Sequence, residues 1–305
     1  MFINVLTQVA ILLILILLGA ILTKAHILTE QGVKSMTDTV LMLVTPCVII
    51  KSFIREFNTS VLKSLLISFL IAFLAHIAFI LIAHLVIHDK DKKRERVLRF
   101  GAIFSNCGFM SIPLQQALLG EEGVFYCSSY IAIFNLFIWS YGLISMSGDK
   151  RFLTPKKMLL SPGIIGLSIG LIIFLFSIPI PKIISEPIYY MASLNTPLPM
   201  IIIGYHLMQS NILKGFTDLK EIFAMAIKLL FYPLIALGVL YLCGVRGTML
   251  VSSVISCSAP TAAITTMFSA KYGADTSLSV NMVSLSTVLS LATMPVVITL
   301  AQHIA

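Results

Sequence analysis

The chain has 305 residues, of which 58% are hydrophobic and 11% charged, and its mean hydropathy is +1.00. A soluble domain carries about 25% charged residues, so this composition excludes one. The formal net charge of +8 would suggest nucleic acid as the partner of a soluble protein. Here the basic residues stand in short stretches between apolar runs, where they set membrane topology, and we expect no nucleic-acid partner.

Apolar runs of about twenty residues, enough to cross about 30 Å of hydrocarbon, recur along the whole chain. The first run lacks the basic start and the cleavage site of a signal peptide, so we count it as a helix. The pattern predicts an all-α polytopic membrane protein with ten transmembrane helices, spans 1 to 10, at about 3–23, 33–53, 61–88, 97–118, 123–147, 159–178, 186–208, 222–243, 247–271 and 275–301.

The basic residues are unevenly divided among the predicted loops. The loops after odd-numbered spans hold 15 Lys and Arg, and the loops after even-numbered spans hold five. By the positive-inside rule the odd loops are cytoplasmic, which places both termini outside the cell and the protein in the plasma membrane. The remaining basic residue, Lys228, stands inside span 8.

A weak internal repeat divides the chain. Thr45-Pro46 and Thr196-Pro197 stand 151 positions apart, and Leu119-Gly120 precedes Tyr272-Gly273 by 153. We predict two five-helix repeats, 1–147 and 159–305, joined by a cytoplasmic linker at 148–158. Because five is odd, the two repeats have opposite orientations in the membrane, as in many secondary transporters.

Two polar, helix-weakening patches interrupt spans 4 and 9 at nearly the same offset. They are Ser105-Asn106-Cys107-Gly108 and Ser258-Ala259-Pro260-Thr261. Proline removes a backbone donor, glycine lowers helix propensity, and an asparagine side chain competes for backbone hydrogen bonds. Non-helical backbone persists in lipid only where protein or a water-filled cavity satisfies it, so paired breaks indicate a transport site.

The residues from Ser105 to Pro113, with Asn135 and Trp139 after them, resemble the auxin efflux carrier family, as does the second-half run from Ala270 to Asp275. The resemblance covers essentially the full chain and points to the bacterial branch, which includes malate and malonate permeases. It implies that broken helices 4 and 9 cross near the bilayer centre. It also implies a dimerising scaffold of helices 1, 2, 6 and 7, and a transport group of helices 3–5 and 8–10 that moves against it.

The chain departs from plant members of that family at two positions. Ser105 stands where they have proline, and Asn135 stands where they commonly have glutamine. The second difference suggests a different substrate.

A carboxylate at the membrane centre needs hydrogen-bond donors and positive potential, which broken helices supply through free N–H groups and helix dipoles. We expect Ser105, Asn106, Cys107 and Gly108 to frame such an anion from one side. Ala259, Pro260 and Thr261 would frame it from the other, and Asn135 would add an amide donor or, alternatively, only join two helices. Thr45, Pro46 and Pro197 are further candidate breaks.

Lys228 and Asp38 are the ionisable residues that we place inside spans other than histidines. Lys228 either snorkels to the cytoplasmic side, pairs with Asp38, or attracts the anion. His76, His84 and His206 are candidates for proton coupling, but lone histidines in bundles are usually packing residues. The five cysteines show no disulfide or metal spacing, and we predict no cofactor and no metal site.

Two other function classes were weighed. An intramembrane enzyme needs converging catalytic groups, and Gly-x-Ser-x-Gly, His-Glu-x-x-His and a phosphate-binding loop are all absent from the sequence. A channel or sensor remains the alternative, although no selectivity-filter repeat or signalling domain supports it. The sequence favours a secondary transporter of small organic anions that works by an elevator-like alternating-access mechanism, as a homodimer, with a proton or sodium ion as possible coupling ion.

Overall fold

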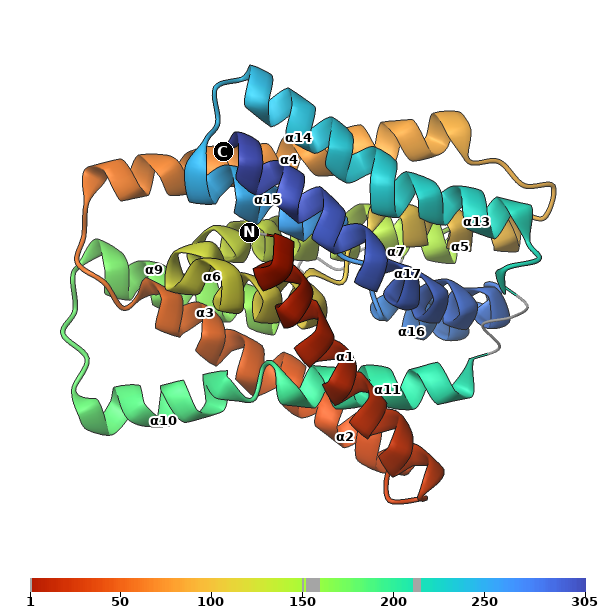
Figure 1. Cartoon of the computed structure of the whole chain (residues 1–305), viewed down its shortest axis with the longest axis horizontal. Helices are drawn as coiled ribbons and strands as arrows, with labels where there is room; N and C mark the ends of the chain where they lie inside the picture. The colour runs from red at the N-terminus through yellow and green to blue at the C-terminus, as the bar shows by residue number, and fades with distance from the viewer. Residues whose placement is uncertain (1, 150, 152–159, 211–214) are drawn as a thin grey trace.

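The computed structural model describes residues 2–149, 151, 160–210 and 215–305, and this part of the chain is built from helices (Figure 1). Short turns join them, and several are interrupted by one π-helical turn. The α-helices are α1 (Phe2–Lys24), α2 (Glu30–Thr39), α3 (Thr45–Phe53), α4 (Thr59–Val86), α5 (Lys92–Ile103), α6 (Ile112–Phe137), α7 (Leu143–Ser147), α9 (Pro162–Leu175), α10 (Lys182–Ser193), α11 (Pro197–Gln209), α13 (Leu219–Ala226), α14 (Tyr232–Leu242), α15 (Gly247–Ser258), α16 (Ile264–Tyr272) and α17 (Thr276–Ile304).

Long apolar helical runs confirm that this is an all-α polytopic membrane protein. Two shorter apolar helices, α9 and α15, add to them. The six runs in the described part of the chain that are long and apolar enough to cross a membrane are Ile3–Lys24, Glu30–Phe53, Thr59–Val86, Cys107–Ser147, Leu219–Leu242 and Thr276–Ile304.

Two glycines allow α1 and α11 to cross in backbone contact. A Cβ added to Gly204 would lie 2.7 Å from the amide nitrogen of Ala20, and one added to Gly19 would lie 2.8 Å from the Cα of Ile201. A second close approach joins α9 to α3, where a Cβ on Gly170 would lie 3.0 Å from the side chain of Phe53. Small residues thus set the spacing of these four helices.

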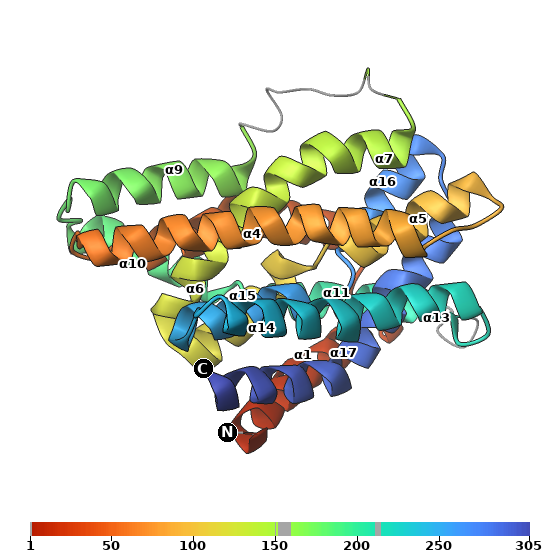
Figure 2. The same ribbon diagram turned by 90° about the horizontal axis from the view of Figure 1, so that it is seen from above.

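The two ends of the chain lie close together in both views (Figures 1 and 2). The start of α1 is beside the end of α17, and these two helices pack against each other. Ends on the same side of a bundle are expected of a chain that crosses a membrane an even number of times.

The structure corrects one predicted break and supports another. At Thr45-Pro46 the helix continues, because a π-helical turn at Val40–Val44 comes directly before it and Pro46 stands at the start of α3. The wider turn accommodates the proline ring and its missing N–H. The helix does stop between α10 and α11, just before Pro197, and the repeat landmark Gly120 leaves helical geometry with φ 63° and ψ −152°.

Aspartates cap α13 and α17 at one end of the bundle, where Arg94 joins them. Asp218 caps α13, and Asp275 caps α17 by accepting from the Leu278 N–H at 2.9 Å. The Arg94 guanidinium forms ion pairs with Asp218, with Asp275 at 3.7 Å and with Asp89 at 3.6 Å. One side chain therefore ties together the starts of α5, α13 and α17.

The Arg94 cluster gives a pH-dependent prediction. Burial alone would raise the pKa of Asp218, but the hydrogen bond and charge of Arg94 lower it below its ordinary value. A carboxyl with a lowered folded-state pKa stabilises the fold above its unfolded pKa of about 3.9, and this contribution is lost as pH falls through the folded value. Arg94→Gln should destabilise the protein by about 1–3 kcal/mol at pH 7.

Thermal melts of wild type and Arg94→Gln from pH 7 to pH 3 check this prediction. The difference in Tm between the two proteins should begin to shrink below about pH 4, because the aspartates of the unfolded chain then bind protons that the folded wild type binds only at lower pH. Arg151→Gln is the control, since that side chain is 90% exposed and its ion pair among the described residues is with Asp149, two positions before it in sequence. A difference in Tm that persists unchanged at pH 3 would show that the stabilisation does not come from the ion pairs of Arg94.

Candidate functional site

The first helix break separates α5 from α6. After Ile103 the backbone of Phe104 is extended, with φ −93° and ψ 118°, and Asn106 is also non-helical, with φ −75° and ψ 55°. The chain becomes helical again in a π-helical turn at Cys107–Ser111, which leads into α6. The predicted interruption of span 4 therefore lies at residues 104–106, and Gly108 already belongs to the resumed helix.

The second break separates α15 from α16. It begins at Ala259, whose backbone is extended with φ −60° and ψ 147°, and helix resumes at Ile264. Pro260 and Thr261 lie in the middle of this segment and are buried. The sequence placed this break correctly, because proline there can neither donate a backbone hydrogen bond nor fit the preceding turn.

The two breaks pair with each other through their backbones. The Asn106 N–H donates to the Pro260 carbonyl at 2.7 Å, and the Ala262 N–H donates to the Phe104 carbonyl at 2.9 Å. Ser105 and Thr261 thus face each other as in a short antiparallel ladder. Backbone groups that lipid could not satisfy find partners in the other half of the chain.

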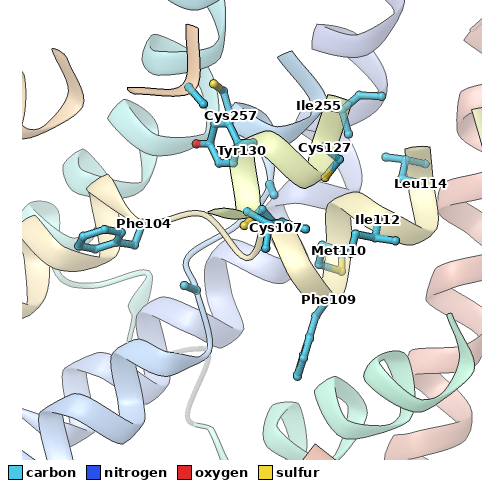
Figure 3. Packing of buried hydrophobic residues seen from close by; sticks show 14 of the residues in the cluster. Phe104, Cys107, Phe109, Met110, Ile112, Leu114, Cys127, Tyr130, Ile255 and Cys257 are labelled. Carbon is cyan, nitrogen blue, oxygen red and sulfur yellow. The ribbon is translucent and has the colours of Figure 1, made fainter. Parts of the chain in front are cut away.

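Side chains close the crossing from the neighbouring helices. The Thr261 hydroxyl donates to the Gly101 carbonyl at 3.0 Å, and the Thr261 N–H donates to the Ser286 hydroxyl of α17 at 3.1 Å. The Tyr130 hydroxyl of α6 lies 3.4 Å from the Ser105 hydroxyl. Figure 3 shows Tyr130, Cys107 and Cys257 gathered where the two extended segments pass each other.

Lys228 brings an amine to this crossing. It stands in a π-helical turn, Ile227–Phe231, between α13 and α14, and its side chain is fully buried. Its Nζ donates to the Ser105 hydroxyl and to the Cys257 carbonyl, the latter at 3.4 Å. Among the described residues no carboxylate pairs with Lys228, so the predicted pair with Asp38 is wrong. Because its amine is buried at the crossing, the snorkelling alternative is wrong as well.

A small hollow of about 10 Å³ lies on the side of the crossing that faces α11. Asn106 lines it, and Phe109 points from the break toward α11 (Figure 3). The Asn106 side-chain nitrogen and the Ser284 hydroxyl of α17 are buried without a hydrogen-bond partner. Unpaired buried polar groups are costly, so a donor and a hydroxyl beside this hollow are groups that a ligand or water would satisfy.

The structure brings together most, but not all, of the predicted site residues. Ser105, Asn106 and Cys107 meet Ala259, Pro260 and Thr261 at the crossing, as the paired contacts above show. Asn135 is not part of this group. Its amide donates to the Ile131 carbonyl of its own helix at 2.8 Å and lies next to Gly163 of α9.

Two other predicted candidates lie elsewhere. Asp38 is exposed on α2 and forms no ion pair with any described residue. Pro197 starts α11, several residues before the part of that helix that lines the hollow. The hydrogen bond of Asn135 stays within its own helix, so it shows neither a ligand contact nor a bond between helices, and the contact of Asn135 with another helix is its packing against Gly163.

The sequence did not indicate Tyr130 and Thr287 as neighbours of the crossing, and it favoured packing roles for His206 and for Ser284 of span 10. Thr287 and His206 line the hollow beside Asn106. Thr287 stands three residues from Ser284 and from Ser290 on α17, and this spacing is the signal that could have found it. A polar stripe of this kind is also typical of ordinary packing between membrane helices.

Comparison with known proteins decides the family. The family model described as membrane transport protein, which includes the auxin efflux carriers, matches residues 4–153 and 150–298. The chain belongs to this family. It is 25% identical over 287 residues to an uncharacterized transporter of Methanothermobacter thermautotrophicus, and 25% identical over 293 residues to one of Methanocaldococcus jannaschii. Each alignment covers 93% of this chain and 94% of the relative.

Membership confirms the predicted resemblance and makes this chain a multi-pass membrane transport protein. The two matched stretches meet at about residue 150, where the sequence predicted the linker. The linker itself lies mostly outside the described residues.

Proposed function

We propose that this membrane transport protein is a secondary carrier of small organic anions, carboxylates such as malate or malonate, with its site at the crossing of the two broken helices. The observation that carries the proposal is the fully buried Lys228 amine, which contacts Ser105 of one break and Cys257 at the edge of the other. Burying an amine in a membrane bundle without a carboxylate partner is costly, and a bound anion would offset that cost.

The anion would also meet polar groups that are not yet paired. The Asn106 amide nitrogen is a free donor beside the hollow. The helices that resume at Cys107 and Ile264 direct their N-terminal ends toward the crossing, and the first N–H groups of a helix favour negative charge. A carboxylate therefore matches the chemistry of the site better than a cation or a neutral sugar does.

Pairs of contacts support the proposed inverted repeat of two times five helices. Gly19 touches the segment around Gly204, and Gly170 touches Phe53. Gly19 and Gly170 are 151 positions apart, as are Phe53 and Gly204, so the two contacts are related by the offset of the repeat.

Two further pairs lie where a two-fold axis between the repeats would run. Phe79 and Tyr232 stand 153 positions apart and stack on each other with ring centroids 4.2 Å apart. Asn106 and Pro260 stand 154 apart and share a hydrogen bond. Residues that touch their own counterparts are expected on such an axis.

We further propose an elevator-like movement and dimerisation through the predicted spans 1, 2, 6 and 7. Both termini would lie outside the cell, with the protein in the plasma membrane. Transport as such is supported by the family, while the anion and the mechanism are our inference. The alternative is a channel or sensor with the same crossing. Saturable uptake and exchange of internal for external substrate separate a carrier from both.

The test is uptake of radiolabelled malate and malonate into proteoliposomes, for wild type and Asn106→Ala. We expect saturable wild-type uptake and a loss of about tenfold or more in the variant, since a hydrogen bond to a charged group contributes about 1.5–3 kcal/mol. Asn4→Ala, on the exposed face of α1, is the matched control and should transport normally. Unchanged uptake in Asn106→Ala contradicts the site.

A further inference from the structure

A second cavity, of about 590 Å³, lies where α5, α13 and α17 begin. Its wall is mostly charged, and three of its four carboxylates are paired, all of them with Arg94 and one also with Lys220. The charged residues that face it are Asp89 from the turn after α4, Arg94 from α5, Asp218, Lys220 and Glu221 from α13 and its cap, and Asp275 from the cap of α17.

Glu221 is the carboxylate in this cavity that has no ion pair. The residue is only 2% exposed, and its Oε1 has no hydrogen-bond partner in the described structure. That oxygen lies against the backbone of Gly215, whose added Cβ would be 3.0 Å away and would also touch Leu285 of α17. A buried carboxylate in this setting is strongly unfavourable when ionised unless a positive charge joins it.

Two helices connect this carboxylate to the crossing. On α13 and the turn after it, Glu221 precedes Lys228 by seven residues, about two helical turns, so both stand on the same helix face. On α17, Asn281 lines the large cavity, while Ser284 and Thr287, three and six residues further, line the hollow beside Asn106. A polar track thus runs from Glu221 toward the anion site.

On this basis, and resting on the carrier function proposed above, we infer that Glu221 binds a single positive charge, a proton or a sodium ion, which travels with the anion. Binding converts the carboxylate to a neutral acid or to an ion pair, and so removes a negative charge from the route of a carboxylate substrate. In the described part of the chain no three His, Cys, Asp or Glu side chains form a metal-ligand group.

Thermal melts of the purified full chain in detergent test the site without any substrate. One arm compares sodium chloride with choline chloride at equal ionic strength, and the other compares pH 5.5 with pH 7.5 in choline chloride. A ligand that binds only the folded state raises its Tm, so we expect wild type to gain a few degrees with sodium or at pH 5.5. The arm that responds identifies the ion.

Glu221→Gln, which imitates the neutral acid, should lose that gain in Tm. Glu221→Asp should need a higher concentration of the same ion to reach the same gain. Glu186→Gln on the exposed side of α10 is the matched control and should keep the wild-type gain. If wild type responds in neither arm, or Glu221→Gln keeps the full response, the inference is overturned. If the glutamine variant does not fold, Glu221→Asp decides instead, and an aspartate variant that responds as wild type does overturns the inference.

Transport then separates this inference from the proposed function. With a substrate that wild type carries, Glu221→Gln should still exchange internal for external anion but lose accumulation driven by the pH or sodium gradient. Accumulation that persists in Glu221→Gln overturns the coupling role. If wild type moves no carboxylate at all, the proposed function fails, and the melting result still stands for the cation site.

Discussion

Lys228→Met is expected to abolish saturable anion uptake while leaving the protein as stable as wild type or more stable. The amine is fully buried and has hydroxyl and carbonyl partners instead of a carboxylate. Methionine has a similar length and no charge to desolvate, and apolar replacements of buried charges are often neutral or stabilising. Loss of a buried charge partner weakens anion binding by at least about 2 kcal/mol. This corresponds to about thirtyfold less uptake at low substrate concentration.

The measurement pairs proteoliposome uptake with thermal unfolding of the same preparation. Four of the five cysteines are buried, so a thiol-reactive dye reports unfolding directly. Lys63→Met, at an exposed position on α4, serves as the control and should change neither quantity. Wild-type uptake in Lys228→Met would show that the anion does not use the amine. A collapse in Tm would show instead that the amine holds the crossing together.

Gly204→Ala is expected to give the largest loss of stability among glycine-to-alanine substitutions in this chain. The new Cβ would lie 2.7 Å from the amide nitrogen of Ala20 in α1, and backbone cannot move aside as a flexible side chain can. Forcing an extra carbon into such a contact costs about 1–3 kcal/mol and pushes α1 away from α11. Gly204→Val should be worse.

Gly238→Ala provides the matched comparison, because that glycine also lies in a helix but an added Cβ there meets nothing within 4 Å. Alanine is the better helix former by about 0.5–1 kcal/mol, so this variant should melt at or above the wild-type temperature. Thermal unfolding in detergent compares the three proteins. Equal Tm values for Gly204→Ala and Gly238→Ala would mean that α1 and α11 do not depend on their close contact.

The local features of this fold could be predicted from the sequence. Apolar length identified the long spans, and the composition of residues 105–108 and 258–261 marked both breaks. These signals act within a few residues, through proline's missing donor, weak helix formers and hydrophobic run length. At Pro46 the same reasoning failed, because a π-helical turn absorbs the proline without ending the helix.

The site depended on contacts that no local pattern encodes. Asn106 and Pro260 are far apart in sequence, and their repeat offset indicated that they correspond without showing that they bond. The sequence places Lys228 about two turns inside span 8 and leaves open whether it snorkels, pairs with Asp38 or attracts the anion. Burial by α15 and the first break, rather than depth along the helix, decides where its amine lies.

Glu221 shows the same limit at a span boundary. The sequence places it just before the predicted span 222–243, among loop charges. In the structure it is the third residue of α13 and is buried by Gly215 and α17. A boundary error of one or two residues, usual for helix ends, was enough to hide it.

The two sides of the crossing differ in how they are held, and this difference bears on the proposed elevator-like movement. Backbone hydrogen bonds fasten the broken helices to each other, so in the proposed movement they would travel together. Toward α11 the surface is different: Ile202, Ile203 and Leu207 meet Phe109 and Val283. Among the described residues no hydrogen bond or ion pair crosses that contact. In the proposed movement, displacement along α11 would exchange one apolar contact for another, so it would meet little resistance beside the proposed anion site.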